Sequence, residues 1–385
     1  MSITTDIEPA AVLENEPRQA GQPAYWTRVL VLCPYPRGGN PSQRFRFEQY
    51  LDALDAKGID IDIESFLDDR AMRILYAPGN YLRKTVHVLQ GFARRVATLF
   101  RVRSYDFVFV HREASPIGPP IFEWMLFRMG CRVIYDFDDA IFVPQKSKPN
   151  PFMRYVRCSW KVAYTVRRAH LVSVCNPYLV AWSRARNSRV ALIPTTVDEN
   201  YHKPREIQRR RTDRQVIGWT GSFSTARFLE IVRPALVELQ KRHDFEFRVI
   251  CDHDPGFPEL RHYRFVPWRF ETEIEDLCEF QIGVMPVPEG EWERGKVGFK
   301  AIQYSAVGMP SVVSAVGSGR EVVVDGQTGL AVENDTESWT RALERLLVDP
   351  ELVRDMGCKA RSHILRRYSV SANVGNYLQL FELDR

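Results

Sequence analysis

Short apolar segments alternate with helical patterns through most of the chain. Residues 28–33 are continuously apolar, which predicts a strand buried in the middle of a parallel sheet. Residues 59–63 alternate apolar and polar positions, as a strand nearer the sheet edge does. Between them we expect a helix with Ser42 as its N-cap and Gly58 at its end. The pattern predicts a strand–helix–strand unit.

The same alternation continues on both sides of a polar break. Before the break we expect strands at 107–110, 132–135, 171–174 and 190–193. After it we expect strands at 216–219, 245–250, 263–266, 282–285 and 310–313. Helical stretches between strands are typical of open, doubly wound sheets. The fold class is therefore α/β, with two Rossmann-like domains that face each other across a cleft.

The domain boundaries follow from this pattern. We expect an N-terminal domain at 25–202, a C-terminal domain at 215–366, and a basic linker without apolar period at 203–214. A last helix within 367–385 is expected to pack back on the N-terminal domain. Residues 1–24 have no apolar block, which predicts a disordered leader instead of a secretory signal.

Composition narrows the class of protein. The 385 residues are 45% apolar and 26% charged, as in ordinary globular proteins, and no segment approaches the roughly 20 apolar residues of a membrane span. The net charge of +5 favours anionic ligands or an acidic membrane surface over nucleic acid. Seven scattered cysteines without CxxC spacing indicate reduced thiols in a cytoplasmic protein.

The most informative stretch is residues 296–329. Gly298 opens a helix that Lys296 and Lys300 flank. Free N–H groups, the helix dipole and two ammonium groups suit a phosphate or diphosphate. The alternative is an ordinary strand–helix–strand unit with glycine turns.

This stretch resembles the C-terminal signature of the group 1 (family 4) glycosyltransferases, which have the two-domain GT-B fold. The residues in register are Gly298, Gln303, Ala306, Gly308, Pro310, Val312, Gly317, Gly319, Glu321, Asp325, Gly326 and Gly329. Upstream, Gly221-Ser222-Phe223 with Arg227 is similar to the family's Gly-Arg-Leu loop and its following Lys. Residues 192–198 and 36–39 resemble its interdomain segment and its N-terminal glycine loop.

The resemblance implies a donor site in the C-terminal domain and an acceptor site in the N-terminal domain. It implies retention of configuration, with the leaving diphosphate helping to deprotonate the acceptor. Arg227 and Lys296 would stabilise that diphosphate. The donor-binding candidates are Gly38, Gly39, Gly221, Ser222, Trp268, Gly298, Phe299, Lys300, Gln303 and Glu321. No cofactor and no metal are expected beyond the nucleotide-diphosphate sugar substrate.

Three positions depart from the family pattern. Gln303 replaces the second Glu of the family's pair, although its amide can still bond ribose hydroxyls. The first Glu falls on Gly295 or, with a slip of the alignment, on Arg294 or Glu293. Glu291 and Glu293 are nearby substitutes. Ser222 replaces the loop Arg, so one diphosphate charge is lost.

Residues 136–139 (Asp-Phe-Asp-Asp) follow a buried strand and admit several interpretations. One is a metal–diphosphate motif, as in the GT-A fold. Another is a metal-free site in which Asp138 or Asp139 faces the acceptor or the donor sugar, and we favour it because the surrounding chain resembles GT-B. A third is a helix N-cap with an acidic first turn. Arg112 follows another strand and either meets a phosphate or pairs with these carboxylates.

Residues 82–103 combine an apolar helical stripe with many basic residues. The stripe consists of Leu82, Val86, Leu89, Ala93, Val96 and Phe100. A basic amphipathic helix of this kind docks on anionic headgroups, which would give peripheral membrane contact. The alternative is a helix packed on the sheet with a solvated basic face.

The sequence therefore predicts a glycosyltransferase of polysaccharide biosynthesis, cytoplasmic or at the inner face of the membrane. It would move a sugar from a nucleotide-diphosphate sugar to a hydroxyl acceptor on a glycan or lipid-linked glycan. The alternatives are a nucleotide-sugar epimerase of the same fold and a catalytically inactive nucleotide- or sugar-binding module.

Overall fold

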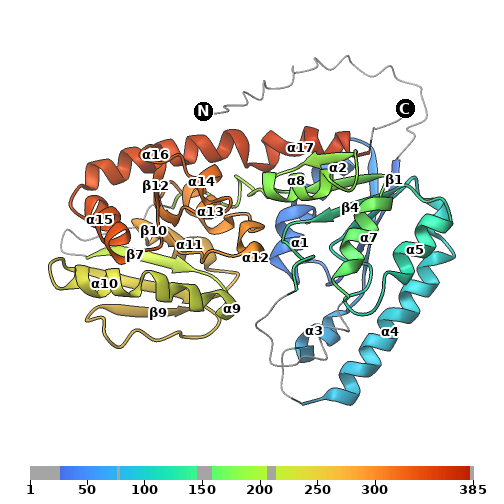
Figure 1. Cartoon of the computed structure of the whole chain (residues 1–385), viewed down its shortest axis with the longest axis horizontal. Coiled ribbons are helices and arrows are strands. Elements are labelled where there is room, and N and C mark those ends of the chain that lie inside the picture. Colours follow the sequence, from blue (N-terminus) through green and yellow to red (C-terminus); the bar gives the residue numbers. More distant parts are fainter. Residues whose placement is uncertain (1–26, 76–78, 145–157, 206–213, 382–385) are drawn as a thin grey trace.

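The computed structural model describes residues 27–75, 79–144, 158–205 and 214–381. These residues form two parallel six-stranded sheets with helices around them (Figure 1). The predicted leader at 1–24 lies outside the described residues, as does the central part of the predicted linker at 203–214. No helix within the described ranges is both long and apolar enough to cross a bilayer.

The N-terminal sheet has the strand order β2-β1-β3-β4-β5-β6. Its strands are β1 (Thr27–Cys33), β2 (Ile59–Ser65), β3 (Phe107–His111), β4 (Val133–Phe137), β5 (Leu171–Val174) and β6 (Val190–Leu192). The order reverses between β1 and β3. In open α/β sheets such a reversal leaves a crevice at the carboxyl ends of the strands, where ligands bind.

The first helix begins earlier than the sequence predicts. Asn40 is the N-cap, because its Oδ1 accepts from Ser42 N at 2.9 Å and Pro41 occupies the first helical turn. Ser42 therefore lies inside α1 (Pro41–Arg46). The other helical segments of this domain are 3₁₀ turns Glu48–Tyr50 and Val102–Ser104, α2 (Leu51–Asp55), α3 (Asp69–Leu75), α4 (Tyr81–Leu99), α5 (Ile121–Arg128), α7 (Trp160–Arg168) and α8 (Pro177–Arg184).

The C-terminal sheet has the order β12-β11-β10-β7-β8-β9, again with one reversal. Its strands are β7 (Gln215–Thr220), β8 (Phe245–Cys251), β9 (Tyr263–Pro267), β10 (Ile282–Met285), β11 (Ser311–Ser314) and β12 (Gly329–Val332). Strand β12 was not predicted. The switch point lies between β7 and β10, so the loop after β7 opens into the crevice of this domain.

The helices of this domain end by crossing back to the first. They are α9 (Phe223–Ala226), the 3₁₀ turn Arg227–Ile231, α10 (Arg233–Gln240), α11 (Glu273–Cys278), α12 (Glu291–Arg294), α13 (Phe299–Ala306), α14 (Gly319–Val322), α15 (Thr336–Leu347), α16 (Pro350–Arg367) and α17 (Val370–Gln379). In α17, Tyr377 stacks on Tyr50 with ring centroids 4.1 Å apart. The last helix thus belongs to the N-terminal core (Figure 1).

Contacts between described residues join the facing edges of the two domains. Phe45 of α1 packs on Phe299 of α13, with ring centroids 4.1 Å apart. Arg44 pairs with Glu273 of α11 at 2.8 Å. Asn176 Nδ2 donates to the carbonyl of residue 295 at 2.8 Å. These contacts fix the carboxyl-end loops of one sheet against those of the other.

Candidate active site

Three basic side chains gather where the loop after β7 meets the start of α13. Arg227 and Lys296 share the ring of Phe228, with Arg227 Cζ at 5.3 Å and Lys296 Nζ at 5.8 Å from its centroid. Lys300 Nζ lies 5.3 Å from the ring centroid of Trp219. We call Arg227, Lys296 and Lys300 the cationic cluster. The structure thus brings together residues that are 73 positions apart in the sequence, from Arg227 to Lys300.

Two glycines make this arrangement possible. A Cβ at Gly221 would lie 2.6 Å from the ring of Trp219 and 2.8 Å from Lys300 Cε, so glycine leaves room for both side chains against the loop. Gly298 has φ +73°, a left-handed conformation that glycine adopts without strain, and it is the N-cap of α13. The first amides of a helix have no acceptor within the helix and can bind an anion at this end.

The cationic cluster has no carboxylate within ion-pair distance among the described residues. Lys300 is partly buried, and this desolvation together with the nearby Lys296 lowers its pKa from 10.5 to about 8. Desolvated ammonium groups that repel each other are costly unless an anion joins them. The site is therefore prepared for a multiply charged anion.

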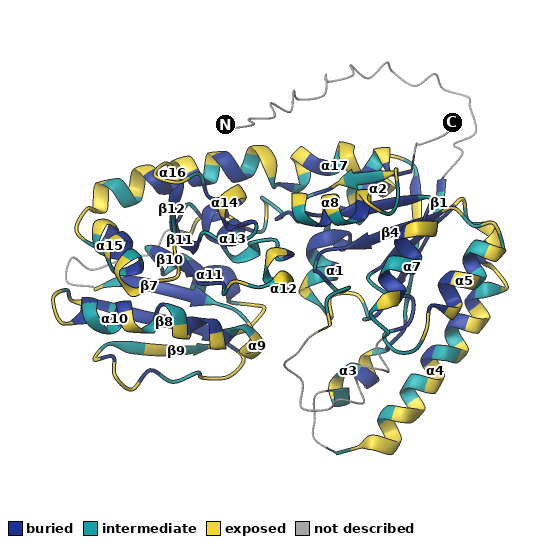
Figure 2. Ribbon diagram, viewed as in Figure 1, coloured by how far each residue is buried: buried dark blue, intermediate teal, exposed yellow. Residues whose placement is uncertain are grey.

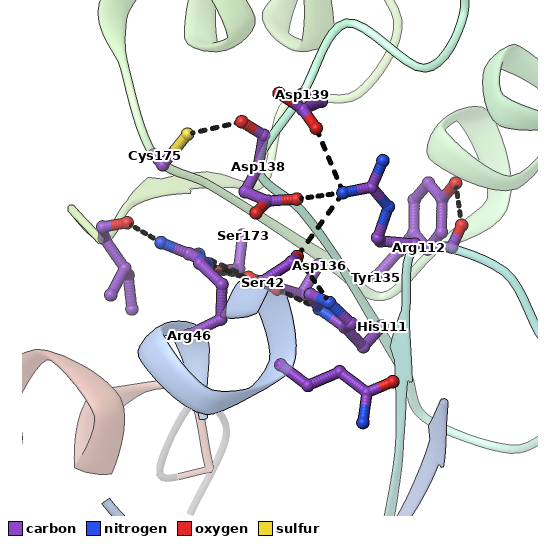
Figure 3. Close-up of polar contacts among 12 residues, drawn as sticks. Ser42, Arg46, His111, Arg112, Tyr135, Asp136, Asp138, Asp139, Ser173 and Cys175 are labelled. Atoms are coloured by element: carbon purple, nitrogen blue, oxygen red, sulfur yellow. Dashed lines mark hydrogen bonds and ion pairs between the residues drawn. The ribbon is translucent and has the colours of Figure 1, made fainter. Parts of the chain in front are cut away.

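On the N-terminal side, Arg112 neutralises the acidic pair. Its Nη1 donates to Asp138 Oδ1 at 2.9 Å and to Asp139 Oδ2 at 3.1 Å (Figure 3). Burial alone would raise the pKa of Asp138, but Arg112, His111, Ser42 and Arg46 together outweigh burial and lower that pKa. Of the two predicted roles of Arg112, the structure has the ion pair.

The backbone at Arg112 is unusual. Its φ is +60°, although it is not a glycine, and Tyr135 Oη donates to its carbonyl at 2.7 Å. A left-handed non-glycine residue costs about 1–3 kcal/mol and persists where the surroundings hold it in place. Here this backbone conformation turns the guanidinium of Arg112, which follows β3, toward the side chains of Asp138 and Asp139, which follow β4.

Asp136 is separate from this pair. Its carboxylate lies fully inside the domain and accepts from Ser173 Oγ at 2.7 Å and from Arg46, which is equally buried. His111 Nδ1 lies 2.8 Å from Asp136 Oδ2. Burial would raise the pKa of Asp136, yet Arg46 and His111 together lower it well below its usual range. Sequence reasoning assigned no role to Arg46 or Ser173.

Gly295 connects the two sides. A Cβ at this position would lie 2.7 Å from the Cβ of Ala140, directly after the acidic pair. The first carboxylate of the family's Glu pair therefore has no room in this chain. The two substitutes, Glu291 and Glu293, lie on α12, which ends just before this contact.

The remaining predicted donor residues lie around the crevice. Phe299 contacts α1, and Gln303 Nε2 lies 3.5 Å from His202 Nε2. Trp268 is 43% exposed, and its indole N–H donates to Glu273 at 3.0 Å, which links it to the Arg44 bridge. Arg44 and Glu273 were not identified from the sequence, because no local sequence pattern predicts an ion pair between two domains.

The glycine loop and the loop after β11 complete the set. Gly38 and Gly39 line a pocket of about 580 Å³ that also includes Arg44 and Phe270. The amide of Gly38 donates to Glu48 at 2.9 Å. Ser222 is exposed and starts α9, and Glu321 is exposed on α14, whose Val322 lies beside Gly298.

Comparisons with known proteins agree with this architecture. Residues 214–349 match the family model described as Glycosyl transferases group 1. A D-inositol 3-phosphate glycosyltransferase from Corynebacterium diphtheriae is 29% identical over 166 residues, which are 39% of this chain and 38% of that protein. The matched part thus spans well under half of that relative.

Two solved structures resemble nearly the whole chain. Sucrose-phosphate synthase from Thermosynechococcus elongatus superposes with a TM-score of 0.67 at 17% identity, covering 92% of this chain and 98% of that one. HepE from Anabaena, in complex with UDP and glucose, gives a TM-score of 0.61 at 12% identity, covering 92% and 99%. Two parallel Rossmann-like domains with these neighbours define the GT-B fold.

The C-terminal domain matches the group 1 glycosyltransferases, as its signature residues predict.

Proposed function

We propose that this protein is a glycosyltransferase that moves a sugar from a nucleotide-diphosphate sugar to a hydroxyl acceptor. The observation that carries the proposal is the cationic cluster, since Arg227, Lys296 and Lys300 lie at the switch point of the C-terminal sheet without carboxylate partners among the described residues. A diphosphate is the anion whose charge and extent fit three converging cations and a helix N-terminus. HepE, a fold neighbour, binds UDP.

The chemistry asked of the protein is largely electrostatic. As the bond between the sugar and the diphosphate breaks, negative charge builds on the leaving group. The cationic cluster would stabilise that charge more strongly in the transition state than in the ground state. The three side chains would supply the positive charge that a metal ion supplies at other diphosphate sites, so this proposed role requires no metal ion.

The acidic pair would face the sugar or the acceptor. Arg112 fixes both carboxylates, and Asp138 is nine-tenths buried, so their acceptor oxygens are held in place for sugar hydroxyls. Ala140 contacts Gly295 and so brings the pair close to Lys296. By family resemblance the reaction retains the anomeric configuration, and the acceptor is a glycan or a lipid-linked glycan.

Donor binding tests the first part of the proposal. A thermal-shift panel of UDP-, GDP- and dTDP-sugars identifies the donor, and calorimetry then compares Arg227→Ala and Lys296→Ala with the wild type. Each lost charge-assisted contact is worth about 1.5–3 kcal/mol, so we expect affinity to fall roughly 10- to 100-fold. Arg354→Ala on exposed α16 is the matched control. Unchanged affinity in both cluster variants removes the phosphate assignment.

Product analysis separates the alternative functions. Transfer from the selected donor to octyl glycosides or sugar acceptors supports the proposal. Exchange of sugar isomers without an acceptor identifies an epimerase, and binding without turnover identifies an inactive module. Activity that is lost in EDTA and restored by Mn²⁺ would favour the metal interpretation of Asp138 and Asp139.

We also propose peripheral contact with the inner face of the membrane through α4. The predicted apolar stripe is not packed on the sheet: Leu82 is 80%, Leu89 61% and Phe100 89% exposed. Figure 2 shows exposed residues along much of α4. The opposite face of α4 is buried instead and includes Gly91 and Arg95. The stripe is therefore exposed, while α4 packs on the domain through its other face.

Charge supports an anionic lipid surface as the partner. A groove of about 850 Å³ between α3 and α4 is lined by Arg70, Arg73 and Arg94 and also by Asp68 and Asp69. Because Asp68 pairs with Arg94 at 3.3 Å, the excess of positive charge in this groove is small. Arg83 is exposed beside the stripe. Basic residues near such a surface contribute about 1 kcal/mol each, and the apolar stripe supplies the insertion.

Vesicle flotation tests this contact. Leu82→Glu combined with Phe100→Glu should abolish binding to vesicles that contain phosphatidylglycerol, whereas Val348→Glu, an exposed apolar position elsewhere, should not. Equal binding of all three proteins refutes the membrane proposal. Arg95 is unsuitable for such a test, because it is buried and donates to the carbonyls of Cys33 and Ala114.

A further inference from the structure

Gln303, on α13, contacts a histidine that is completely buried at the boundary between the two domains. Gln303 Nε2 lies 3.5 Å from Nε2 of His202, which belongs to the segment that follows β6. The imidazole packs beside two aromatic rings, with centroids 5.9 Å from Phe45 and 5.1 Å from Tyr201. The ring of His202 is therefore held in one orientation, with one nitrogen toward Gln303.

The second ring nitrogen of His202 determines what the first can do. His202 Nδ1 lies 3.3 Å from the carbonyl oxygen of Asp198, and because a carbonyl only accepts, Nδ1 carries the hydrogen. Burial lowers the pKa of His202 from 6.5 to about 4, against the opposing bond to Asp198 and with help from the charge of Arg44. The imidazole is therefore neutral at pH 7, and its Nε2 is an acceptor. The amide NH₂ of Gln303 donates to it.

The backbone of His202 is tied to the helix that carries Gln303. Arg361 of α16 donates through Nη1 to the carbonyl of His202 at 3.2 Å, and through the same nitrogen to the carbonyl of Ala306, the last residue of α13. The backbone N–H of His202 donates to the carbonyl of Asp198 at 2.8 Å. These contacts set the distance between the imidazole and Gln303 independently of the Gln303 side chain.

The bond to His202 leaves the other end of the Gln303 amide available. Among the described residues, Oε1 of Gln303 has no hydrogen-bond partner. Lys300 of the cationic cluster precedes Gln303 by three residues, so both side chains lie on one face of α13. In a nucleoside diphosphate the ribose is bonded directly to the diphosphate. A free carbonyl oxygen one helical turn from the cationic cluster is therefore well placed for ribose hydroxyls.

We propose that His202 is a positioning residue, which holds the amide of Gln303 so that its carbonyl oxygen faces the ribose of the donor; this role rests on the proposed function. A carboxylate presents an accepting oxygen in either orientation of its plane, whereas an amide does so in only one. His202 thus gives Gln303 the accepting character that the family's Glu has without help. Because the two ribose hydroxyls donate to this oxygen, the pair should favour ribonucleotides over nucleotides that lack those hydroxyls.

Calorimetry with UDP and GDP, each against its 2′,3′-dideoxy counterpart, tests this role. The wild type should bind the preferred ribonucleotide about tenfold more tightly than the dideoxy form. His202→Phe keeps an aromatic ring and removes the acceptor, while the Asp198 carbonyl retains the backbone N–H of residue 202. This variant should lose most of the ribose preference and bind the dideoxy nucleotide as the wild type does.

A second substitution separates positioning from packing. Gln303→Glu, added to His202→Phe, should restore a ribose preference of about tenfold or more, because a carboxylate accepts in both orientations and its bonds are charge-assisted. A packing defect at residue 202 would not be repaired by a change of charge at residue 303. A double variant that binds the diphosphate without a ribose preference therefore overturns the role of His202.

The wild-type comparison needs no variant. Equal affinity for the ribo and dideoxy forms overturns the role of His202 and leaves the proposed function standing, as does a His202→Phe protein with the wild-type preference. Failure of every nucleoside diphosphate to bind removes the proposed function and this role with it. ¹⁵N spectra of labelled histidines test the tautomer without ligand: the resonance missing from His202→Phe should belong to the Nδ1-protonated form, and an Nε2-protonated form refutes the proposal.

Discussion

Lys300 is expected to weaken the free protein and to strengthen its complex with a nucleotide. Burial and the repulsion of Lys296 lower the pKa of Lys300 from 10.5 to about 8. At about 1.4 kcal/mol per pKa unit, keeping this ammonium charged at pH 7 costs up to roughly 3 kcal/mol. Solvent screens a side chain that is only partly buried, so we expect an effect of about 1–3 kcal/mol.

Lys300→Met removes the charge and keeps most of the length of the side chain. We expect it to raise the melting temperature of the free protein, at roughly 2–4 °C per kcal/mol, and to weaken binding of UDP or the preferred nucleoside diphosphate at least tenfold. Lys359→Met, on exposed α16, is the control and should change neither. Differential scanning calorimetry with and without nucleotide measures both effects.

The pH dependence has a definite sign. Between pH 8 and 10.5 the unfolded chain keeps the Lys300 proton while the folded chain releases it, so the stability of the wild type gains from rising pH. Nucleotide affinity should fall over the same range, because the ammonium is lost. A Lys300→Met protein that is less stable than the wild type and binds nucleotide equally well would refute the reasoning.

Three further substitutions test other parts of the site. Asp136→Asn leaves Arg46 buried without its carboxylate and should lower the free energy of unfolding, measured in urea at pH 7, by roughly 3–5 kcal/mol. Since the pKa of Asp136 is lowered in the folded protein, the wild type should lose this contribution to stability as the pH falls below about 4. Gly295→Ala should push against Ala140 and increase the radius of gyration in X-ray scattering; an unchanged radius contradicts a tight contact there. Ser222→Arg restores the charge that the family pattern has in this loop and should tighten nucleotide binding up to about tenfold; unchanged affinity would place the loop away from the diphosphate.

Most of the fold could be predicted from the sequence, because most of its strands are continuously apolar and its loops carry glycines. Strand β12 (Gly329–Val332) was missed, since it has four residues and directly follows a glycine turn. The sequence predicts Ser42 as the N-cap, whereas Asn40 forms it. The two residues are separated by Pro41, which lies in the first turn of the helix. Local signals of this kind predict that a helix exists better than where it begins.

The polar core of the site depends on register, which a single sequence does not give. His111, Asp136 and Ser173 stand at similar positions in three strands, but only the pairing of those strands brings them to one carboxylate. The burial of Arg46 could not be predicted either. An arginine in an amphipathic helix is usually solvated, whereas Arg46 lies fully buried.

Helix α4 shows another limit of prediction from sequence, since the helix was predicted but its packed face was not. Its apolar stripe was visible in the sequence, yet its pattern could not show which face packs against the domain. Phe92 and Arg95 occupy the inner face, and Gly91 lets the helix approach Phe66, where a Cβ would come within 2.7 Å. The stripe is consequently left on the outside.

A crystal structure of the protein with UDP, or with the nucleoside diphosphate that stabilises it most, tests the central claim most directly. The account predicts phosphate oxygens within hydrogen-bond distance of Lys296 and Lys300, close to Arg227 and to the first turn of α13. A diphosphate bound elsewhere, or no binding of any nucleoside diphosphate at millimolar concentration, would contradict it.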